Sequence, residues 1–179
     1  MATFRRVTLD DINDAPVRLH SDHRIGATRQ AVWDLLAGDP ARWGDFCPGF
    51  DHSGHWTKQT PDGVGAVRQV RVGKLTFLDE ILANDPGERW AFRVESAALP
   101  LAKALAEDYV LEDAPGGCVL HWSAGVWPHG PAALARPLLT PALKTFARLL
   151  VKGVEKAART GSDTGSGTGS GGGPDAGTA

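Results

Sequence analysis

The middle of the chain alternates hydrophobic and polar residues, which is the period of a β-strand with one buried face. The alternation is clearest in RWAFRVE (89–95) and in CVLHWSAGVW (118–127). Turn-forming sequences flank these runs, NDPG at 84–87 and PGG at 115–117, so we expect hairpins. Short strands joined in this way predict an antiparallel meander. The residues expected on its inward face are Trp90, Phe92, Val94, Leu120, Trp122 and Ala124.

A helical period replaces this alternation near the end of the chain. Hydrophobic residues recur there every three or four positions, which predicts a long amphipathic helix. Pro141 suits its first turn, and Pro137 indicates that any helix before it is separate or kinked. The opposite face is rich in Lys and Arg, and we interpret it as a solvated surface. The predicted apolar stripe comprises Leu139, Leu143, Phe146, Leu150, Val154 and Ala157.

The first third of the chain predicts one strand and two short helices. VRLHSDHRIGA (17–27) is typical of a strand, and Thr28 is a good N-cap for a helix through RQAVWDLL (29–36). GDP (38–40) ends that helix, and PARWGDF (40–46) predicts a second short helical turn. This order of elements predicts an α+β fold in which a curved antiparallel sheet wraps around the long C-terminal helix.

Length and composition fit one folded domain with a segment at each end. The chain has 179 residues, of which 42% are hydrophobic and 22% charged, as is usual for a globular domain. We expect an N-terminal extension at 1–14 and the folded domain at 15–159. Residues 160–179 are mostly Gly, Ser and Thr and include no apolar anchor, which predicts a disordered tail.

Charge and cysteine usage argue against several classes of function. The net charge is −2 and no basic arm is present, so a nucleic-acid partner is not expected. Cys47 and Cys118 lack metal-ligand spacing, and His52 and His55 have no third ligand, so we expect no metal and no cofactor. Neither a signal-peptide core nor an apolar run of about 20 residues is present. We therefore expect a cytoplasmic protein without stable membrane insertion.

The strand predicted in GVGAVRQVRV (63–72) carries an arginine on its more apolar face. Counting by twos, Arg68 shares that face with Val70 and Val72, whereas Arg71 lies on the other face. An arginine stays charged in an apolar enclosure and offers a planar set of N–H donors. Arg68 is therefore expected either to contact a ligand or to form an ion pair with an acid inside the molecule.

Three further polar residues are candidates for the same interior. If Arg68 has a structural role, its expected partner is Glu80 or Glu107. Tyr109, the only tyrosine, shares a face with Glu107 and acts either as a proton donor to a ligand or as part of the wall. The strand KLTFLDEILAND (74–85) is hydrophobic on both faces, so its inward side cannot be assigned from the pattern.

Five phrases, in order along residues 15–158, resemble the START-like or SRPBCC superfamily, also called the birch-pollen-allergen fold. IGATRQAVWDLLAGDPARWGDFCPGF (25–50) resembles its opening, and GVGAVRQVRV resembles its Gly-x-Gly-x-x-Arg strand. DEILANDPGERWAFRV (79–94) resembles its Glu, Asp-Pro, aromatic hairpin, and GGCVLHW (116–122) its last hairpin. The long helix is the fifth. The resemblance is to the polyketide cyclase/dehydrase and lipid-transport branch.

The resemblance implies a helix-grip fold whose sheet and long helix enclose a cavity. The expected partner is a small hydrophobic ligand, apolar or polycyclic and lipid-like or polyketide-like, and homodimer formation is left open. Trp43 and Phe46 are expected at the cavity entrance. The residues expected to line the cavity are Trp33, Trp43, Phe46, Arg68, Val70, Trp90, Phe92, Tyr109, Leu120, Trp122, Leu143, Phe146 and Leu150.

Three functions stay open at this stage. The first is a binding or carrier protein that performs no chemistry. The second is a cofactor-free polyketide cyclase or aromatase, in which Arg68, Tyr109 and Glu107 are the candidates for assisting enolisation and dehydration. The third is a regulatory protein whose outer surface binds a protein partner. An open cavity would favour the first two, and a filled one the third.

Overall fold

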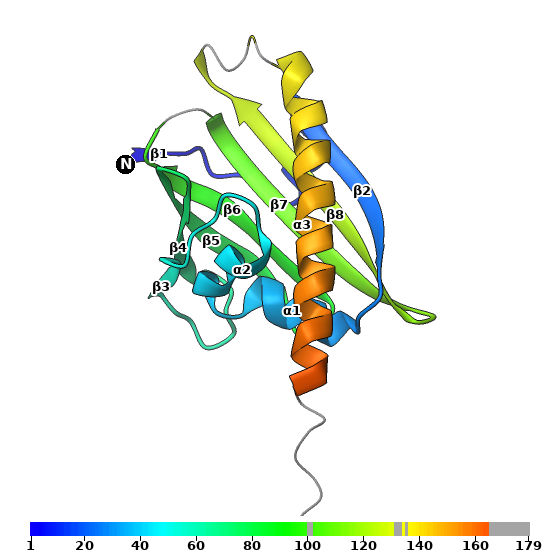
Figure 1. The fold of residues 1–179 in the computed structure, drawn as a ribbon. Coiled ribbons are helices and arrows are strands. Elements are labelled where there is room, and N and C mark those ends of the chain that lie inside the picture. The colour runs from blue at the N-terminus through cyan, green and yellow to red at the C-terminus, as the bar shows by residue number, and fades with distance from the viewer. Residues whose placement is uncertain (100–101, 131–133, 135, 165–179) are drawn as a thin grey trace, which may run out of the picture.

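A single antiparallel sheet forms most of the protein in this computed structural model, which describes residues 1–99, 102–130, 134 and 136–164. Seven of its eight strands follow one another in the order β2-β8-β7-β6-β5-β4-β3, and β1 pairs with β6 outside this path (Figure 1). The strands are β1 (Ala2–Thr3), β2 (Val17–Ile25), β3 (His55–Lys58), β4 (Val67–Val72), β5 (Leu75–Asp85), β6 (Arg89–Ala97), β7 (Ala102–Ala114) and β8 (Gly117–Pro128).

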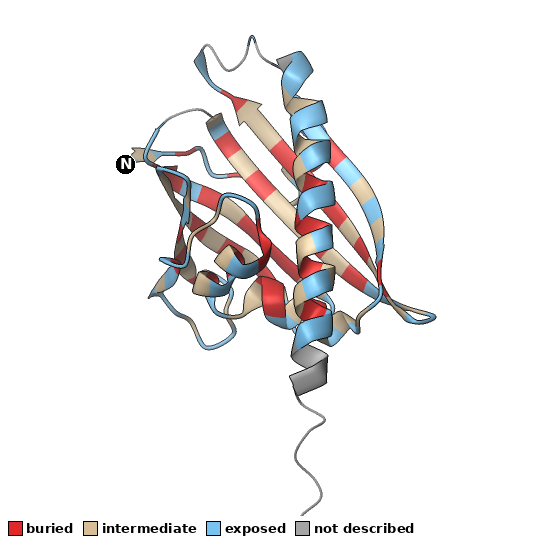
Figure 2. Cartoon of the chain, viewed as in Figure 1, coloured by how far each residue is buried: buried red, intermediate tan, exposed pale blue. Residues whose placement is uncertain are grey.

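The long helix α3 (Arg136–Thr164) lies against one face of the sheet, and α1 (Arg29–Ala37), η2 (Pro40–Arg42) and α2 (Trp43–Phe46) lie together beside it (Figure 1), whereas η1 (Asp10–Asp14) packs against β8 on the outer face. Buried residues gather on the sheet face toward α3 and on the facing side of that helix (Figure 2). The predicted α+β helix-grip fold is thereby confirmed.

The boundaries of α3 differ from the prediction at both ends. The helix begins at Arg136, so Pro137 occupies the first turn and Pro141 lies inside the helix. The fixed φ of proline and its missing N–H suit a first turn, which explains why the helix starts one turn earlier than expected. The helix also continues to Thr164, beyond the predicted start of the tail. The rest of that segment, 165–179, lies outside the described residues.

The N-terminal extension covers the outer face of the sheet. Its first residues form β1 against the end of β6. Val7 and Ile12 then form a second buried cluster with Ala104 and Ala106, which point away from α3. The strand β7 therefore buries residues on both of its faces, one toward α3 and the other under the N-terminal extension.

One glycine sets the distance between α2 and α3. A Cβ at Gly153 would lie only 1.9 Å from the carbonyl oxygen of Phe46, so the two backbones can approach only because this residue has no side chain. Phe46 itself is buried and packs against Trp43 with ring centroids 5.4 Å apart. Gly153 thus holds α2, and with it Trp43, against the long helix.

Candidate functional site

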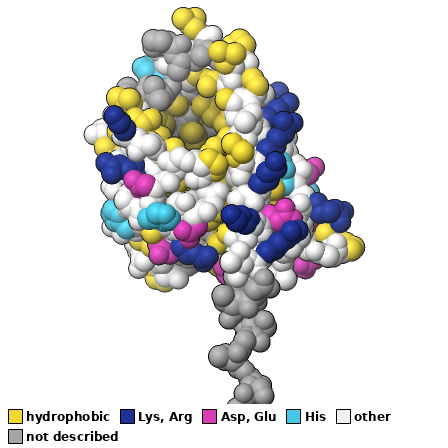
Figure 3. Space-filling view, viewed as in Figure 1, with side chains coloured by type: hydrophobic (Ala, Val, Ile, Leu, Met, Phe, Trp, Pro, Cys, Tyr) yellow, Lys and Arg dark blue, Asp and Glu magenta, His cyan; other side chains and the backbone are white. Residues whose placement is uncertain are grey.

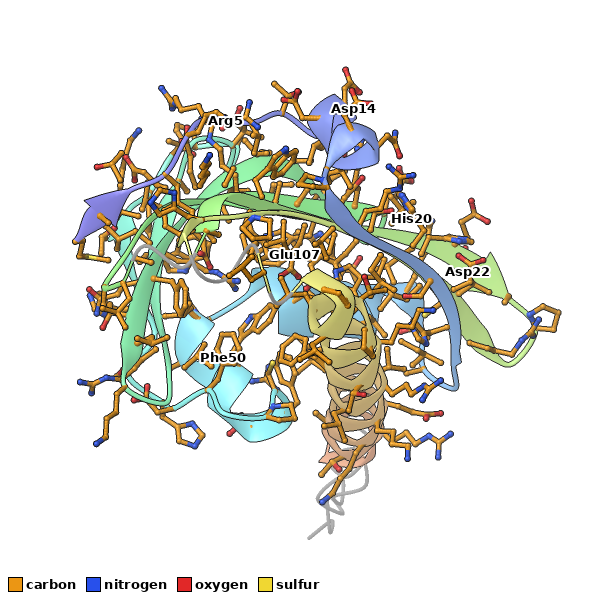
Figure 4. All side chains as sticks on the ribbon, turned by 90° about the horizontal axis from the view of Figure 1, so that it is seen from above. Arg5, Asp14, His20, Asp22, Phe50 and Glu107 are labelled. Atoms are coloured by element: carbon orange, nitrogen blue, oxygen red, sulfur yellow. The ribbon has the colours of Figure 1, made fainter. Side chains whose placement is uncertain are left out.

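A cavity of about 150 Å³ lies between the sheet and α3, and its walls are mostly apolar. It is open on the face that carries the long helix, where Figure 3 shows a hollow rimmed by hydrophobic side chains. In Figure 4, Glu107 points from the sheet toward this space and Phe50 lies on the opposite side. The lining residues are Trp43, Phe50, Arg68, Val70, Val72, Phe77, Asp79, Phe92, Val94, Leu105, Glu107 and Phe146.

Arg68 and Asp79 form an ion pair in the cavity wall. The register of β4 and β5 places the two residues opposite each other, and Arg68 Nε donates to Asp79 Oδ2 at 3.0 Å. Both residues are fully buried, with 1% and 2% of their surface exposed. Burial raises the pKa of Asp79, and the Arg68 guanidinium opposes that rise. The prediction that Arg68 pairs with Glu80 or Glu107 was therefore wrong. Glu80 accepts a hydrogen bond from Arg93 on the other face of the sheet, and Glu107 accepts from Tyr109 and Trp122.

Aromatic rings surround the Arg68 guanidinium. Its central carbon lies 4.3 Å from the ring centroid of Trp43, 4.5 Å from that of Trp90 and 4.9 Å from that of Phe92. These cation–π contacts compensate part of the cost of burying the charge. Arg68 Nη2 and Asp79 Oδ1 nevertheless have no hydrogen-bond partner within the described residues. Buried polar atoms without a partner are costly, so this pair is incompletely satisfied.

Glu107 is a second polar residue in the cavity wall, and two side chains donate hydrogen bonds to it. The Tyr109 hydroxyl donates to its carboxylate, and Trp122 Nε1 donates to Oε2 at 3.2 Å. Burial raises the pKa of Glu107 to about 7, although the hydrogen bond from Tyr109 opposes the rise. Burial, followed by the nearby Glu107, also raises the pKa of Tyr109 well above its usual value. Glu107 is therefore a carboxyl group that can hold or release a proton near neutral pH.

Tyr109 does not line the cavity, although it points inward as expected. Its ring is fully buried and stacks on Trp122 at a centroid distance of 5.5 Å. The ring of Phe92 lies on its other side at 6.5 Å. Because its hydroxyl is engaged with Glu107, Tyr109 acts on the cavity only through that carboxyl group.

The structure places five of the residues expected in the cavity on its wall: Trp43, Arg68, Val70, Phe92 and Phe146. Leu143 is half-buried beside the core, and Trp33 is half-buried on α1, where its indole N–H donates to the Arg89 carbonyl. Neither residue is part of the wall. The other expected residues are buried in the core but likewise absent from the wall, namely Phe46, Trp90, Tyr109, Leu120, Trp122 and Leu150.

Sequence reasoning missed six lining residues. Val72 and Val94 share their faces with Arg68 and Phe92, so alternation contained the signal for them. Asp79 gave no such signal, because its strand is hydrophobic on both faces. The remaining three are Phe50, Phe77 and Leu105.

The described part of the chain contains neither a cluster of metal ligands nor a helix that could span a membrane. No group of three His, Cys, Asp or Glu side chains there is arranged to hold a metal ion. None of the helices described is both long enough and apolar enough to cross a bilayer. Cys47 and Cys118 are buried free thiols, and burial raises the pKa of both.

Comparison with known proteins identifies the family and supports the fold. The family model described as polyketide cyclase / dehydrase and lipid transport matches residues 16–160. An uncharacterized protein of Mycobacterium tuberculosis is 33% identical over 155 residues, which are 84% of this chain and 92% of that protein.

Two solved structures have the same fold at low sequence identity. The Zhui aromatase/cyclase from Streptomyces sp. R1128 aligns with a TM-score of 0.65 and 17% identity, covering 84% of this chain and 98% of its own. A START superfamily protein from Mycobacterium smegmatis aligns with a TM-score of 0.63 and 12% identity, covering 78% and 97%. At these identities the likeness establishes the fold alone.

Proposed function

This chain belongs to the polyketide cyclase / dehydrase and lipid transport family, and from that premise we propose that it binds a small, uncharged, largely apolar ligand in its cavity. The observation that carries the proposal is an open apolar cavity whose wall contains two buried polar atoms, Arg68 Nη2 and Asp79 Oδ1, for which the described part of the chain supplies no hydrogen-bond partner. Once the rings around the guanidinium shift, a ligand hydroxyl can accept from the first and donate to the second, which recovers the free energy lost by burying them unpaired.

The charges around the cavity favour a neutral ligand. Asp79 already neutralises Arg68, and Glu107 adds a carboxyl group that is partly ionised at neutral pH. An anionic ligand would therefore meet no net positive charge to compensate its desolvation. Apolar cavities of about 150 Å³ hold a single aromatic ring. We therefore expect one ring or a short branched chain to be enclosed, with the rest of a larger ligand extending through the opening.

Filling the cavity is expected to weaken binding strongly without unfolding the protein. Leu105 lines the cavity and is half-buried, so Leu105→Trp should occupy the ligand volume at a modest cost in stability. Isothermal titration with 2-naphthol, a neutral aromatic ring system with one hydroxyl, is expected to show binding to the native protein that weakens about tenfold or more in the variant. Thermal unfolding would verify that Leu105→Trp remains folded.

Val64→Trp is the matched control, because Val64 is 44% exposed and does not line the cavity. It should bind 2-naphthol as the native protein does. Native mass spectrometry of protein purified from its own host gives a second measurement, in which a co-purifying neutral compound is expected. Equal binding to a folded Leu105→Trp protein would show that the cavity is not the site.

A second function, cyclisation of a poly-ketone, is supported by the position of Glu107. Its carboxylate is able to remove a proton next to a ketone while Arg68 Nη2 donates to the enolate oxygen. The enolate carbon then attacks a second carbonyl group of the same chain, and the resulting alkoxide takes the proton back from Glu107. In this version Glu107 carries the acid–base role, and Tyr109 positions it.

The cyclase version predicts a dependence of rate on Glu107 and on pH. Glu107→Gln should lower the turnover of a reactive poly-ketone about 100-fold or more. Tyr109→Phe should retain more activity but shift the pH–rate profile, because Tyr109 hydrogen-bonds the carboxyl group. The native rate should rise with pH around the Glu107 pKa of about 7. Unchanged turnover by Glu107→Gln would exclude this chemistry and leave ligand binding as the function.

A further inference from the structure

The solvent-facing side of α3 combines exposed leucines with a row of cations. Leu138 is 70% exposed and Leu149 is 46% exposed, and their separation along the helix places them on the same side. Leu134, just before the helix, is 87% exposed. We call this surface the α3 face. Its exposed cations are Lys144, Arg148, Lys152, Lys156 and Arg159.

Within α3 itself, positive charge is nearly unopposed. Residues 136–160 contain one acidic residue, Glu155, which forms an ion pair with Arg159 at 2.7 Å. The chain as a whole has a net charge of −2, so the residues outside this helix carry a larger net negative charge than the whole chain does. Net positive charge is therefore concentrated on this helix, which gives the α3 face a positive potential in an otherwise acidic protein.

The cavity opens beside the α3 face. Figure 3 shows the hollow and the Lys and Arg side chains that follow the helix on one side of the molecule. The start of β7 lies at the same end of the molecule as the start of α3, as Figure 1 shows. Leu99, which follows β6, is 51% exposed. A surface that touched the α3 face would therefore also lie close to the cavity opening.

We propose that the α3 face docks reversibly on an anionic lipid bilayer. The leucines enter the interfacial region, and the cations lie against the phosphate groups. A bilayer fits better than an acidic protein, because the cations are spread along the helix and the exposed leucines protrude singly. A groove does lie between α2 and α3 beside Lys156, but none of these leucines lines it. The docked geometry is peripheral, since none of the described helices can span a membrane.

The experiment is flotation of the full-length protein with vesicles of phosphatidylcholine containing about 30 mol% phosphatidylglycerol, beside vesicles of phosphatidylcholine alone. Two double variants alter the α3 face. The charge variant is Lys144→Glu/Lys152→Glu, and the leucine variant is Leu134→Ser/Leu138→Ser. Arg24→Glu/Lys58→Glu is the matched charge control, since both residues are exposed on other elements. Val64→Ser is the matched apolar control. Thermal unfolding verifies that each variant is folded.

We expect the native protein to bind only the anionic vesicles, and less at high salt, while each α3 variant binds about tenfold more weakly or worse. The two controls should stay within about twofold of native. Absence of binding, equal losses in the controls, or a loss confined to the charge variant would overturn the proposal, the last because it would show attraction to the anionic surface without entry of the leucines. Vesicle binding needs no filled cavity, so this test is independent of the 2-naphthol titration.

Discussion

Replacing Asp79 by alanine is expected to lower the free energy of unfolding by about 3–5 kcal/mol. The substitution leaves the Arg68 guanidinium buried with 1% exposure and without the acid to which it donates a hydrogen bond. The three aromatic rings around the guanidinium remain, but cation–π contacts do not replace a carboxylate partner. Urea unfolding followed by tryptophan fluorescence measures the loss.

A compensating double variant separates the lost charge partner from lost packing. Arg68→Met/Asp79→Leu replaces both charges by apolar groups and should recover most of the stability lost in Asp79→Ala. Asp108→Ala is the matched control, because it removes the partner of Arg89, whose side chain is 38% exposed, and should cost about 1 kcal/mol or less. A loss from Asp79→Ala as small as that of the control would contradict the buried-charge explanation.

Glu107→Gln is expected to make the protein more stable at pH 8 but not at pH 4. The folded state holds the Glu107 proton with a pKa of about 7, against the ordinary value of 4.5. Because the folded state binds this proton more tightly than the unfolded chain, native stability falls as pH rises from 4.5 to about 7 and is then level. Glutamine cannot ionise, so the variant should gain up to about 3 kcal/mol above pH 7.

Glutamine also preserves the local hydrogen bonds. Its side-chain oxygen can accept from the Tyr109 hydroxyl and from Trp122 Nε1, as the carboxylate does. Urea unfolding at intervals between pH 4 and pH 8 measures the difference between native and variant proteins. Glu95→Gln, on the exposed surface of β6, is the control and should show no comparable dependence. A difference independent of pH would mean that Glu107 does not titrate in this range.

The inward faces of the strands were predictable from the sequence because alternation is a local property. Trp90, Phe92, Leu120 and Trp122 are all buried as expected, and so is Arg68. The partner of Arg68 was not predictable, because it depends on the register between two strands. That register places Asp79 opposite Arg68, and the doubly hydrophobic pattern around Asp79 hid its orientation.

Alternation distinguishes inside from outside but does not locate a cavity. Trp122 and Tyr109 point inward and are completely enclosed, whereas Val94 and Leu105 reach the cavity wall. The difference depends on where α3 crosses the sheet and how closely α2 packs on it. Those contacts join residues far apart in the sequence, and no periodic pattern contains them.

The contact at Gly153 has a consequence for how a ligand enters and leaves. With no side chain between them, the backbones of α2 and α3 touch, so the two helices cannot slide past each other there without collision. Trp43, which lines the cavity from α2, is thereby fixed at the C-terminal half of α3. Any movement of the cavity wall that lets a ligand in or out is therefore expected to involve elements other than the contact between α2 and α3.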